Sequence, residues 1–421
     1  MVAKDIWKRN WGGGNMEWKC YKIDELIDEI SMGPFGSDVK KEFYVKKGVP
    51  ILNGSNLQGF KLQEDSFGYL TEEKAKTLKK CIAQKGDIIV THRGTLGQIV
   101  YVPKNSKYDK YVISQSQFRF RCKKDLVDVP YLVYYFHTRE GQHKILANAS
   151  QVGVPALARA TSTFRRIEIC LPPLAIQRRI ASILSSLDRK IELNNKINAD
   201  LEEMAQAIFK NWFVDFEPFK DGKFVDSELG MIPKGWKVGS PYEYVKVVYG
   251  APYKSAKFND NGEGLPLIRI RDLKNCNPQF YTPEILPQTE YVNMGDIVAG
   301  MDAEFVPHIW KGNTGLLNQR VCKLMPQQTS ISNLFVLYLM KPELEFVQSY
   351  KTGTTVSHLG KADIDKFVVV LPPLEVVEEC SKILDSILQR IKNISAESRT
   401  LSTLRDTLLP RLMSGEIEVP E

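Results

Sequence analysis

The 421-residue sequence has no apolar run close to the roughly 20 residues that a membrane-spanning helix needs. Its polar, glycine-rich beginning also lacks the apolar core of a signal peptide. We therefore expect no membrane association and a cytoplasmic location. The periodic pattern starts only near Trp18, so we interpret residues 1–16, with Gly12, Gly13, Gly14 and Asn15, as an N-terminal extension, either natural or added by cloning.

The sequence also lacks paired metal ligands. Its cysteines form no C-x-x-C pair, and its five histidines show no zinc spacing to match them. We expect no metal site, and we expect the cysteines to be reduced, as in a reducing compartment. The seven cysteines are Cys20, Cys81, Cys122, Cys170, Cys276, Cys322 and Cys380.

Catalytic motifs are missing as well. The Pro-Pro pairs are flanked by leucine, whereas an adenine methyltransferase needs an Asn-Pro-Pro-Tyr or Asp-Pro-Pro-Tyr pocket. No glycine-rich loop ends in the Gly-Lys-Ser or Gly-Lys-Thr of an ATPase. Asp65 with Glu72, Glu73 and Lys74 resembles a nuclease set only by common spacing. His92, His308 and His358 lack neighbouring nucleophiles, so we predict no catalytic residue.

What is present is the composition of an ordinary folded protein, with 43% hydrophobic and 25% charged residues. The formal net charge is +7. Residues 17–171 hold 25 Lys and Arg against 17 Asp and Glu, whereas residues 226–371 hold 15 of each. Charge permits binding to a polyanion without requiring it.

An internal repeat dominates the sequence. Leu171-Pro172-Pro173-Leu174 recurs 200 residues later as Leu371-Pro372-Pro373-Leu374, and Ile191 and Leu201 recur as Ile391 and Leu401. Upstream, Trp18-Lys19 matches Trp236-Lys237, Gly48 to Ile51 matches Gly264 to Leu267, and Gly86-Asp87-Ile88 matches Gly295-Asp296-Ile297. A period this long indicates two tandem units rather than a solenoid.

Each unit begins with a domain of mixed composition. Short β-rich runs such as Asp87 to Val90, Gln98 to Val102, Gln117 to Arg121 and Phe367 to Val370 alternate with turns, and a helical run near Tyr131 to His137 has its counterpart at Leu334 to Met340. We predict an α+β fold. Its expected divisions are a first domain at 17–172, a helix at 173–214, a linker at 215–231, a second domain at 232–372 and a helix at 373–415.

A long helix is predicted after each Leu-Pro-Pro-Leu, because proline suits the first helical turn. Pro218 and Gly415 supply stop signals, so each helix runs for about 40 residues, or roughly 60 Å. Apolar residues in both helices alternate by three and four, which is the pattern of a coiled-coil seam. The seam residues are Ile180, Leu184, Leu187, Ile191, Leu201, Ala205, Ile208, Trp212, Cys380, Leu384, Ile387, Ile391, Ile394, Leu401, Leu408 and Leu412.

Polar residues interrupt this seam at Asn194, Asn198, Ser398 and Arg405. They either fix the register of pairing or lie exposed at the edge of the seam. We favour antiparallel pairing of the two helices within one chain, which would give a dumbbell with pseudo-two-fold symmetry. The heptads alone would equally serve an intermolecular coiled coil.

Taken together, these features resemble the DNA specificity subunits of type I restriction and modification enzymes, over nearly the whole chain. The resemblance rests on the doubled layout, both Leu-Pro-Pro-Leu segments with Gln177 after the first, both Gly-Asp-Ile segments, and the bridge from Trp212-Phe213-Val214-Asp215-Phe216-Glu217-Pro218 into Ile232-Pro233-Lys234-Gly235-Trp236.

The resemblance implies two target recognition domains, each binding one half of a split sequence in double-stranded DNA, with the helices as a ruler between the halves. It also implies docking of two methylation subunits and of restriction and translocation subunits. This chain would bind no cofactor, and S-adenosylmethionine, ATP and Mg²⁺ would belong to the partners. The second helix departs from the pattern, with Glu375-Val376-Val377-Glu378-Glu379 where Gln177-Arg178-Arg179 stands in the first.

DNA recognition needs forked donors and amides for base edges, with cations and hydroxyls for phosphates. Such residues cluster in corresponding loops of both halves, and although each alone is more typical of a solvated turn, the set together favours DNA recognition. In the first half they are Lys40, Lys41, Asn53, Ser55, Asn56, His92, Arg93, Ser114, Gln115 and Ser116. In the second half they are Tyr253, Lys254, Arg269, Arg271, Asp272, Asn318, Gln319 and Arg320.

Two other functions remain open from the sequence. The heptads and the neutral second half also fit a coiled-coil scaffold or assembly protein, which differs from a DNA-binding protein in the salt dependence of binding. An enzyme would need a cluster of carboxylates or histidines that the sequence does not display.

Overall fold

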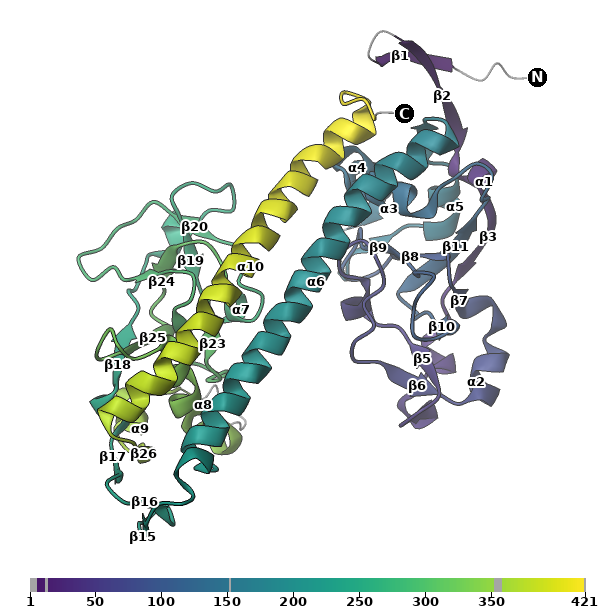
Figure 1. The fold of residues 1–421 in the computed structure, drawn as a ribbon. Coiled ribbons are helices and arrows are strands. Elements are labelled where there is room, and N and C mark those ends of the chain that lie inside the picture. The colour runs from purple at the N-terminus through teal and green to yellow at the C-terminus, as the bar shows by residue number, and fades with distance from the viewer. Residues whose placement is uncertain (1–5, 12–13, 151–152, 352–357, 420–421) are drawn as a thin grey trace. The chain divides into compact units, whose positions relative to one another are not determined.

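The computed structural model describes residues 6–11, 14–150, 153–351 and 358–419. The chain divides into two compact units. Unit 1 comprises Met1–Arg189 and Leu401–Glu421, and unit 2 comprises Lys190–Thr400. The two long helices, α6 (Leu174–Phe213) and α10 (Leu374–Ser414), lie within one residue of their predicted limits at both ends, and each contributes one part to each unit (Figure 1). The division therefore cuts through both helices and differs from the division into domains and helices expected from the sequence.

In the described part of unit 1, three sheets have more than two strands. A five-stranded sheet has the order β4-β6-β5-β10-β7, a four-stranded antiparallel sheet the order β3-β11-β8-β9, and a three-stranded sheet the order β1-β2-β14. Its strands are β1 (Ile6–Trp11), β2 (Gly14–Lys22), β3 (Ile27–Met32), β4 (Tyr44–Val45), β5 (Val49–Ile51), β6 (Gly68–Leu70), β7 (Ile82–Gln84), β8 (Ile88–Thr91), β9 (Ile99–Tyr101), β10 (Lys110–Val112), β11 (Gln117–Cys122), β12 (Ala149–Ser150), β13 (Ala156–Leu157) and β14 (Glu168–Leu171). Its short helices are α1 (Ile23–Leu26), α2 (Glu72–Thr77), α3 (Val129–His137), α4 (Arg139–Leu146) and α5 (Ala160–Arg165), with 3-10 turns η1 (Gly36–Asp38), η2 (Lys41–Phe43), η3 (Gly54–Leu57) and η4 (Lys79–Cys81).

Unit 2 repeats this plan. A four-stranded antiparallel sheet has the order β18-β25-β22-β23, and a second sheet the order β20-β19-β24-β21. Its strands are β15 (Phe224–Val225), β16 (Ile232–Pro233), β17 (Lys237–Gly239), β18 (Val245–Tyr249), β19 (Leu265–Ile268), β20 (Tyr281–Thr282), β21 (Tyr291–Val292), β22 (Ile297–Gly300), β23 (His308–Ile309), β24 (Gly315–Leu317), β25 (Val321–Pro326) and β26 (Val369–Leu371). Its remaining helices are α7 (Ile270–Leu273), α8 (Asn333–Lys351) and α9 (Lys361–Ile364), with 3-10 turns η5 (Glu217–Phe219), η6 (Pro241–Glu243) and η7 (Ser255–Lys257).

The two units share their strand topology as well as their composition. In each, one parallel pair, β5 with β10 or β19 with β24, lies in an otherwise antiparallel sheet. In each, the strand before the long helix pairs antiparallel with an early strand, β14 with β2 or β26 with β17. The predicted α+β fold and the tandem repeat are therefore confirmed.

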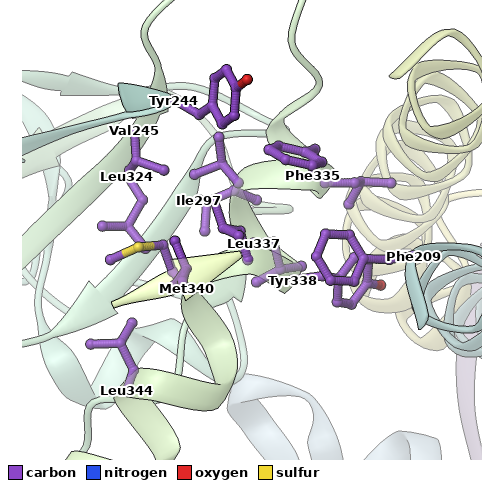
Figure 2. Close-up of a cluster of buried hydrophobic side chains, with 14 of the residues drawn as sticks. Phe209, Tyr244, Val245, Ile297, Leu324, Phe335, Leu337, Tyr338, Met340 and Leu344 are labelled. Atoms are coloured by element: carbon purple, nitrogen blue, oxygen red, sulfur yellow. The ribbon is translucent and has the colours of Figure 1, made fainter. Parts of the chain in front are cut away.

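The long helices pack on their domains through aromatic residues. In unit 2, Phe209 of α6 lies against Phe335 and Tyr338 of α8, with ring centroids 5.7 and 5.8 Å apart (Figure 2). In unit 1, Ile180 and Leu184 of α6 share a buried cluster with the aromatic residues of α3. Each domain is thus fixed to a helix by a continuous apolar core, and burial of this kind contributes about 25 cal/mol per Å².

The helices pair antiparallel within one chain. In unit 2, Asn194 Nδ2 of α6 donates to Glu397 Oε2 of α10 at 2.8 Å, and Asn198 Nδ2 donates to Ser395 Oγ at 3.0 Å. The partner number falls as the first number rises, which defines antiparallel pairing. Asn194 and Asn198 are only 1% and 3% exposed, so these polar positions are interior rather than at an exposed edge. Ser398 is also buried, and every predicted seam residue is buried or half-buried.

Two expectations need correction. Cys20 and Cys170 form a disulfide instead of remaining reduced, because they lie directly opposite each other in the antiparallel pair of β2 and β14. The first residues also take part in secondary structure, since β1 pairs with β2 over Ile6 to Trp11. Gly12 and Gly13 lie outside the described residues.

Candidate nucleic-acid interface

Seven of the ten polar residues predicted in the first half converge at one end of the sheet β3-β11-β8-β9. His92 follows β8 and donates its backbone N–H to the carbonyl of Ser116, just before β11, at 2.9 Å. Gln117 Nε2 donates to the carbonyl of Asn53 at 3.3 Å, and Gln98 Nε2 donates to the carbonyl of Gly54 at 3.1 Å. These bonds join the start of η3 to the start of β11 and to the residue before β9. The first loop cluster consists of Asn53, Ser55, His92, Arg93, Ser114, Gln115 and Ser116.

Within this cluster, Asn53, Ser55, Arg93 and Gln115 are exposed. Burial lowers the pKa of His92, which leaves the imidazole neutral near pH 7. Its Nε2 lies 3.2 Å from the carbonyl oxygen of Gln115. A carbonyl only accepts hydrogen bonds, so Nε2 carries the proton and Nδ1 is an acceptor.

Three other residues of the first set have different surroundings. Asn56 is 1% exposed, and its Nδ2 donates to the carbonyls of Gln63 and Asp65, so it supports the loop from inside. Lys40 and Lys41 are exposed after η1, where Lys40 Nζ lies 3.9 Å from Glu42.

Unit 2 builds the equivalent arrangement from different side chains. Met301, after β22, donates its N–H to the carbonyl of Arg320 at 2.9 Å, as His92 does to Ser116. Gly250, after β18, donates to the carbonyl of Val321 at 3.2 Å, as Gly33 does to Gln117 at 2.8 Å. The equivalent end of the equivalent sheet is therefore held by the same backbone hydrogen bonds in both units. The second loop cluster consists of Lys254, Arg269, Arg271, Gln319 and Arg320.

Most of the second loop cluster is exposed. Lys254, Arg271, Gln319 and Arg320 are open to solvent, whereas Arg269 is half-buried with its guanidinium 4.6 Å from the ring centre of Phe280. Burial lowers the pKa of Arg269 without discharging it at neutral pH.

Three further predicted residues of this half are buried. Asp272 Oδ2 accepts from the N–H of Arg269 at 3.0 Å, and Asn318 Oδ1 accepts from the N–H of Arg320 at 3.2 Å. Tyr253 is 6% exposed, and its hydroxyl hydrogen bonds to Thr289. These side chains hold the loops that present the others.

Sequence reasoning missed two glycines that allow this construction. A Cβ on Gly33 would lie 1.9 Å from the carbonyl oxygen of Ser114, and one on Gly250 would lie 2.2 Å from that of Asn318. Any other residue would force these strands apart. The sequence did contain a signal for them, because Gly33 and Gly250 lie at nearly the same distance before the matched segments Gly48 to Ile51 and Gly264 to Leu267.

Behind each cluster, the Gly-Asp-Ile segment holds the sheet together. Asp87 is fully buried and accepts from Arg121 Nε at 2.7 Å and Arg121 NH2 at 3.0 Å, while Arg119 NH1 lies 3.5 Å away. In unit 2, Asp296 Oδ2 lies 3.7 Å from Lys323 Nζ. In each unit, the aspartate before the strand that leads to the cluster, β8 or β22, thus pairs with a basic side chain of the neighbouring strand, β11 or β25.

The starts of the two long helices differ in their hydrogen bonds. In unit 1, Gln177 is 1% exposed and bonds through Nε2 to the carbonyls of Leu126 and Pro172, at 3.0 and 2.9 Å, and through Oε1 to the N–H of Asp128 at 3.0 Å. In unit 2, buried Val377 replaces it, and the Tyr244 hydroxyl donates to the carbonyl of Pro372 instead. In unit 2, Tyr244 thus supplies to the carbonyl of Pro372 the hydrogen bond that Gln177 supplies to the carbonyl of Pro172 in unit 1.

The structure gives no support to the nuclease-like set. Glu72 pairs with Lys110 at 2.5 Å, Lys74 Nζ lies 4.2 Å from the ring centre of Phe43, and the backbone carbonyl of Asp65 accepts from Asn56. Among the described residues, no group of three or more His, Cys, Asp or Glu could hold a metal ion. Over the same residues, no helix has both the length and the hydropathy needed to span a bilayer.

Comparison with known proteins decides the family. The model of the type I restriction modification DNA specificity domain matches residues 15–203 and again residues 233–401. The chain belongs to this family.

Relatives match along nearly the whole chain. The MjaIX specificity subunit of Methanocaldococcus jannaschii is 28% identical, with 96% of this chain and 94% of that protein covered. The HindI specificity subunit of Haemophilus influenzae is 22% identical, with coverage of 95% and 100%. The crystal structure of the type I system S subunit from M. genitalium has the same fold, with a TM-score of 0.52, 17% identity, and coverage of 94% and 96%.

Membership places this chain among the specificity subunits, which are non-catalytic components that take part in DNA target recognition and complex assembly. The expectation that the chain is not itself an enzyme is therefore confirmed.

Proposed function

We propose that the chain recognises a bipartite sequence in double-stranded DNA, with one loop cluster binding each half. The observation that supports this most directly is the equivalence of the two clusters. They lie at equivalent ends of equivalent sheets but present different donors and acceptors. Equivalent backbone geometry would dock two DNA segments in the same way. Different side chains would select different bases.

The long helices would set the spacing between the two half-sites. Both helices pass from one unit to the other, and Asn194 and Asn198 are buried polar residues with specific partners on α10. A buried amide in a seam penalises shifted pairings, because its partner would then be apolar. We therefore propose that these residues fix the register, and with it the length of the DNA spacer.

The partners in this proposal are two methylation subunits and the restriction and translocation subunits. The methylation subunits would dock against the helices, use S-adenosylmethionine and modify an adenine turned out of the duplex. ATP and Mg²⁺ would serve the translocation step in the restriction subunits. This chain would contribute no cofactor, and the complex would work in the cytoplasm, where its DNA is found.

Mapping of methylated adenines in cells that express this chain with its methylation subunit tests the proposal. Adenines confined to one split motif with a fixed spacer are the expected result. A binding titration of the purified complex supplies the second readout, in which log affinity falls linearly with log salt concentration. Methylation without a motif, together with salt-independent binding to another protein, would instead identify a scaffold.

A further inference from the structure

At the second loop cluster, the predicted residue Arg320 is joined by two side chains, those of Asp302 and His358, that the predicted set does not include. Asp302 follows β22, Arg320 precedes β25, and His358 follows α8. Met301 N–H donates to the carbonyl of Arg320 at 2.9 Å, Leu359 N–H donates to the carbonyl of Met301 at 2.8 Å, and Asp302 forms a β-bridge with His358. Three segments distant in sequence are thus fixed side by side by their backbones.

The side chains of this group share one carboxylate. Arg320 NH1 lies 3.1 Å from Asp302 Oδ2, and His358 Nδ1 lies 2.7 Å from Asp302 Oδ1. The Asp302 side chain is 17% exposed, whereas those of Arg320 and His358 are each 54% exposed. The acid is therefore turned inward and the two donors face solvent.

We infer that Arg320 recognises a guanine in the half-site bound by unit 2, and that Asp302 is the residue that positions it. This inference rests on the proposed function and adds a base to it. Among the described residues, no group binds the edge formed by Nε and NH2 of Arg320, and this edge offers two parallel N–H groups. Guanine presents two acceptors, O6 and N7, side by side in the major groove, and an arginine fork is the most common group that binds both.

Asp302 matters because a free arginine side chain would lose rotamer freedom on binding. Fixing a side chain rich in rotamers at an interface costs conformational entropy. An arginine already held by a carboxylate has lost part of this freedom before DNA arrives. The shared carboxylate also offsets the charge of the guanidinium, which favours directional contact with a base over general attraction to phosphate.

Unit 1 distributes its charges differently at the equivalent positions. Ser116 stands in the place of Arg320, Arg93 in that of Asp302, and Ala156 in that of His358. Among the described residues, no carboxylate forms an ion pair with Arg93. The pair of an arginine with a carboxylate at these positions is therefore specific to unit 2, and the guanine contact should belong to the half-site that unit 2 binds.

The test begins with the methylation motif of the wild-type complex, which identifies the bases of both half-sites. Initial methylation rates are then measured for duplexes in which each half-site base pair is changed in turn. Arg320→Ala should reduce the preference for one guanine by about 5- to 150-fold, the equivalent of 1–3 kcal/mol for a bidentate contact at 1.4 kcal/mol per tenfold. Asp302→Asn retains the size of the side chain and should relax the same base pair to a smaller extent.

Lys246→Ala is the matched control, because it removes one positive charge from β18 four residues before Gly250, roughly 13 Å along the strand. It should leave every base preference unchanged. Arg320→Lys serves as the second variant if Arg320→Ala does not fold, since it retains the charge but loses the fork.

Three results would overturn the inference. The first is a uniform loss of methylation on all duplexes with Arg320→Ala, which would place Arg320 on phosphate. The second is an unchanged base preference with Asp302→Asn, which would remove the positioning role. The third is relaxation of a base pair other than guanine with cytosine. Absence of any motif in the wild type would instead reject the proposed function itself.

Discussion

Replacement of Asp87 by alanine should destabilise unit 1 far more than the equivalent replacement of Asp296 destabilises unit 2. Asp87 has no exposed surface and faces Arg121 and Arg119, and the Arg119 side chain is only 4% exposed. Removing one partner of a buried ion pair costs about 3–5 kcal/mol, because the remaining charge stays buried. Glu29, which also bonds to Arg119 at 2.7 Å, limits the loss but does not replace the contacts to Arg121.

Asp296 is a natural control because it occupies the same place in the repeat. Its side chain is 22% exposed, its ion pair with Lys323 is 3.7 Å long, and Lys323 keeps a hydrogen bond of 2.7 Å to the carbonyl of Tyr291. The cost of Asp296→Ala should therefore be only about 1.5–3 kcal/mol, the value of one charge-assisted hydrogen bond.

Hydrogen exchange followed by mass spectrometry separates the two units, since peptides from β11 report on unit 1 and peptides from β25 on unit 2. Asp87→Ala should reduce the opening free energy of β11 by about 3–5 kcal/mol and leave β25 unchanged. In a thermal scan, the transition of unit 1 should fall by about 6–20 °C, at 2–4 °C per kcal/mol for a unit of this size. Equal effects of the two substitutions would refute the argument from burial.

Three further results are expected. Gln177→Ala should lower the unfolding free energy of unit 1 by about 2–4 kcal/mol in urea titration, because it leaves buried backbone groups without partners; no change would contradict a role in fixing the start of α6. The double replacement Asn198→Leu with Ser395→Ala should raise stability by about 1–4 kcal/mol yet broaden the methylated spacer, and a single unchanged spacer would remove these residues from register control. The hydrogen bond to Arg119 is the main cause that lowers the pKa of Glu29 from 4.5. The stabilisation that Glu29 contributes is therefore complete above its pKa in the unfolded state and is lost as pH falls through its pKa in the folded state. Glu29→Gln should flatten the acid side of a plot of unfolding free energy against pH, below about pH 4.5.

The repeat predicted the architecture because it depends on patterns that survive divergence. A shift of 200 residues aligned both helix starts, and the structure places the helices within one residue of the predicted limits. Periodicity likewise identified the seam, since apolar spacing directly determines which face of a helix is buried. Burial of the asparagines was undecided in the sequence, because the same heptad position can lie at the centre or at the edge of an interface.

The site was harder to predict, since exposure and pairing depend on tertiary structure. Asn56 and Gln115 have similar side chains in similar loops, but Asn56 is buried by η3 and Gln115 is exposed. Cys20 and Cys170 are 150 residues apart, and only strand register places them opposite each other. His358 was judged not to be a catalytic base, and its pairing with Asp302 could not be predicted because Asp302 is also distant in sequence.

The two units separate the residues that build the loops from those that would select DNA. Gly33 and Gly250, together with Asp87 and Asp296, determine where strands meet, and they are alike in both repeats. The exposed side chains on the resulting edge differ at nearly every position. A backbone held from behind tolerates such changes, because substitution of an exposed loop residue away from caps and ion pairs usually alters stability by no more than about 0.5 kcal/mol. Replacing the exposed residues of one cluster by those of the other should therefore change the bound half-site without loss of fold. Replacing the glycines or aspartates by other residue types should instead disrupt the fold.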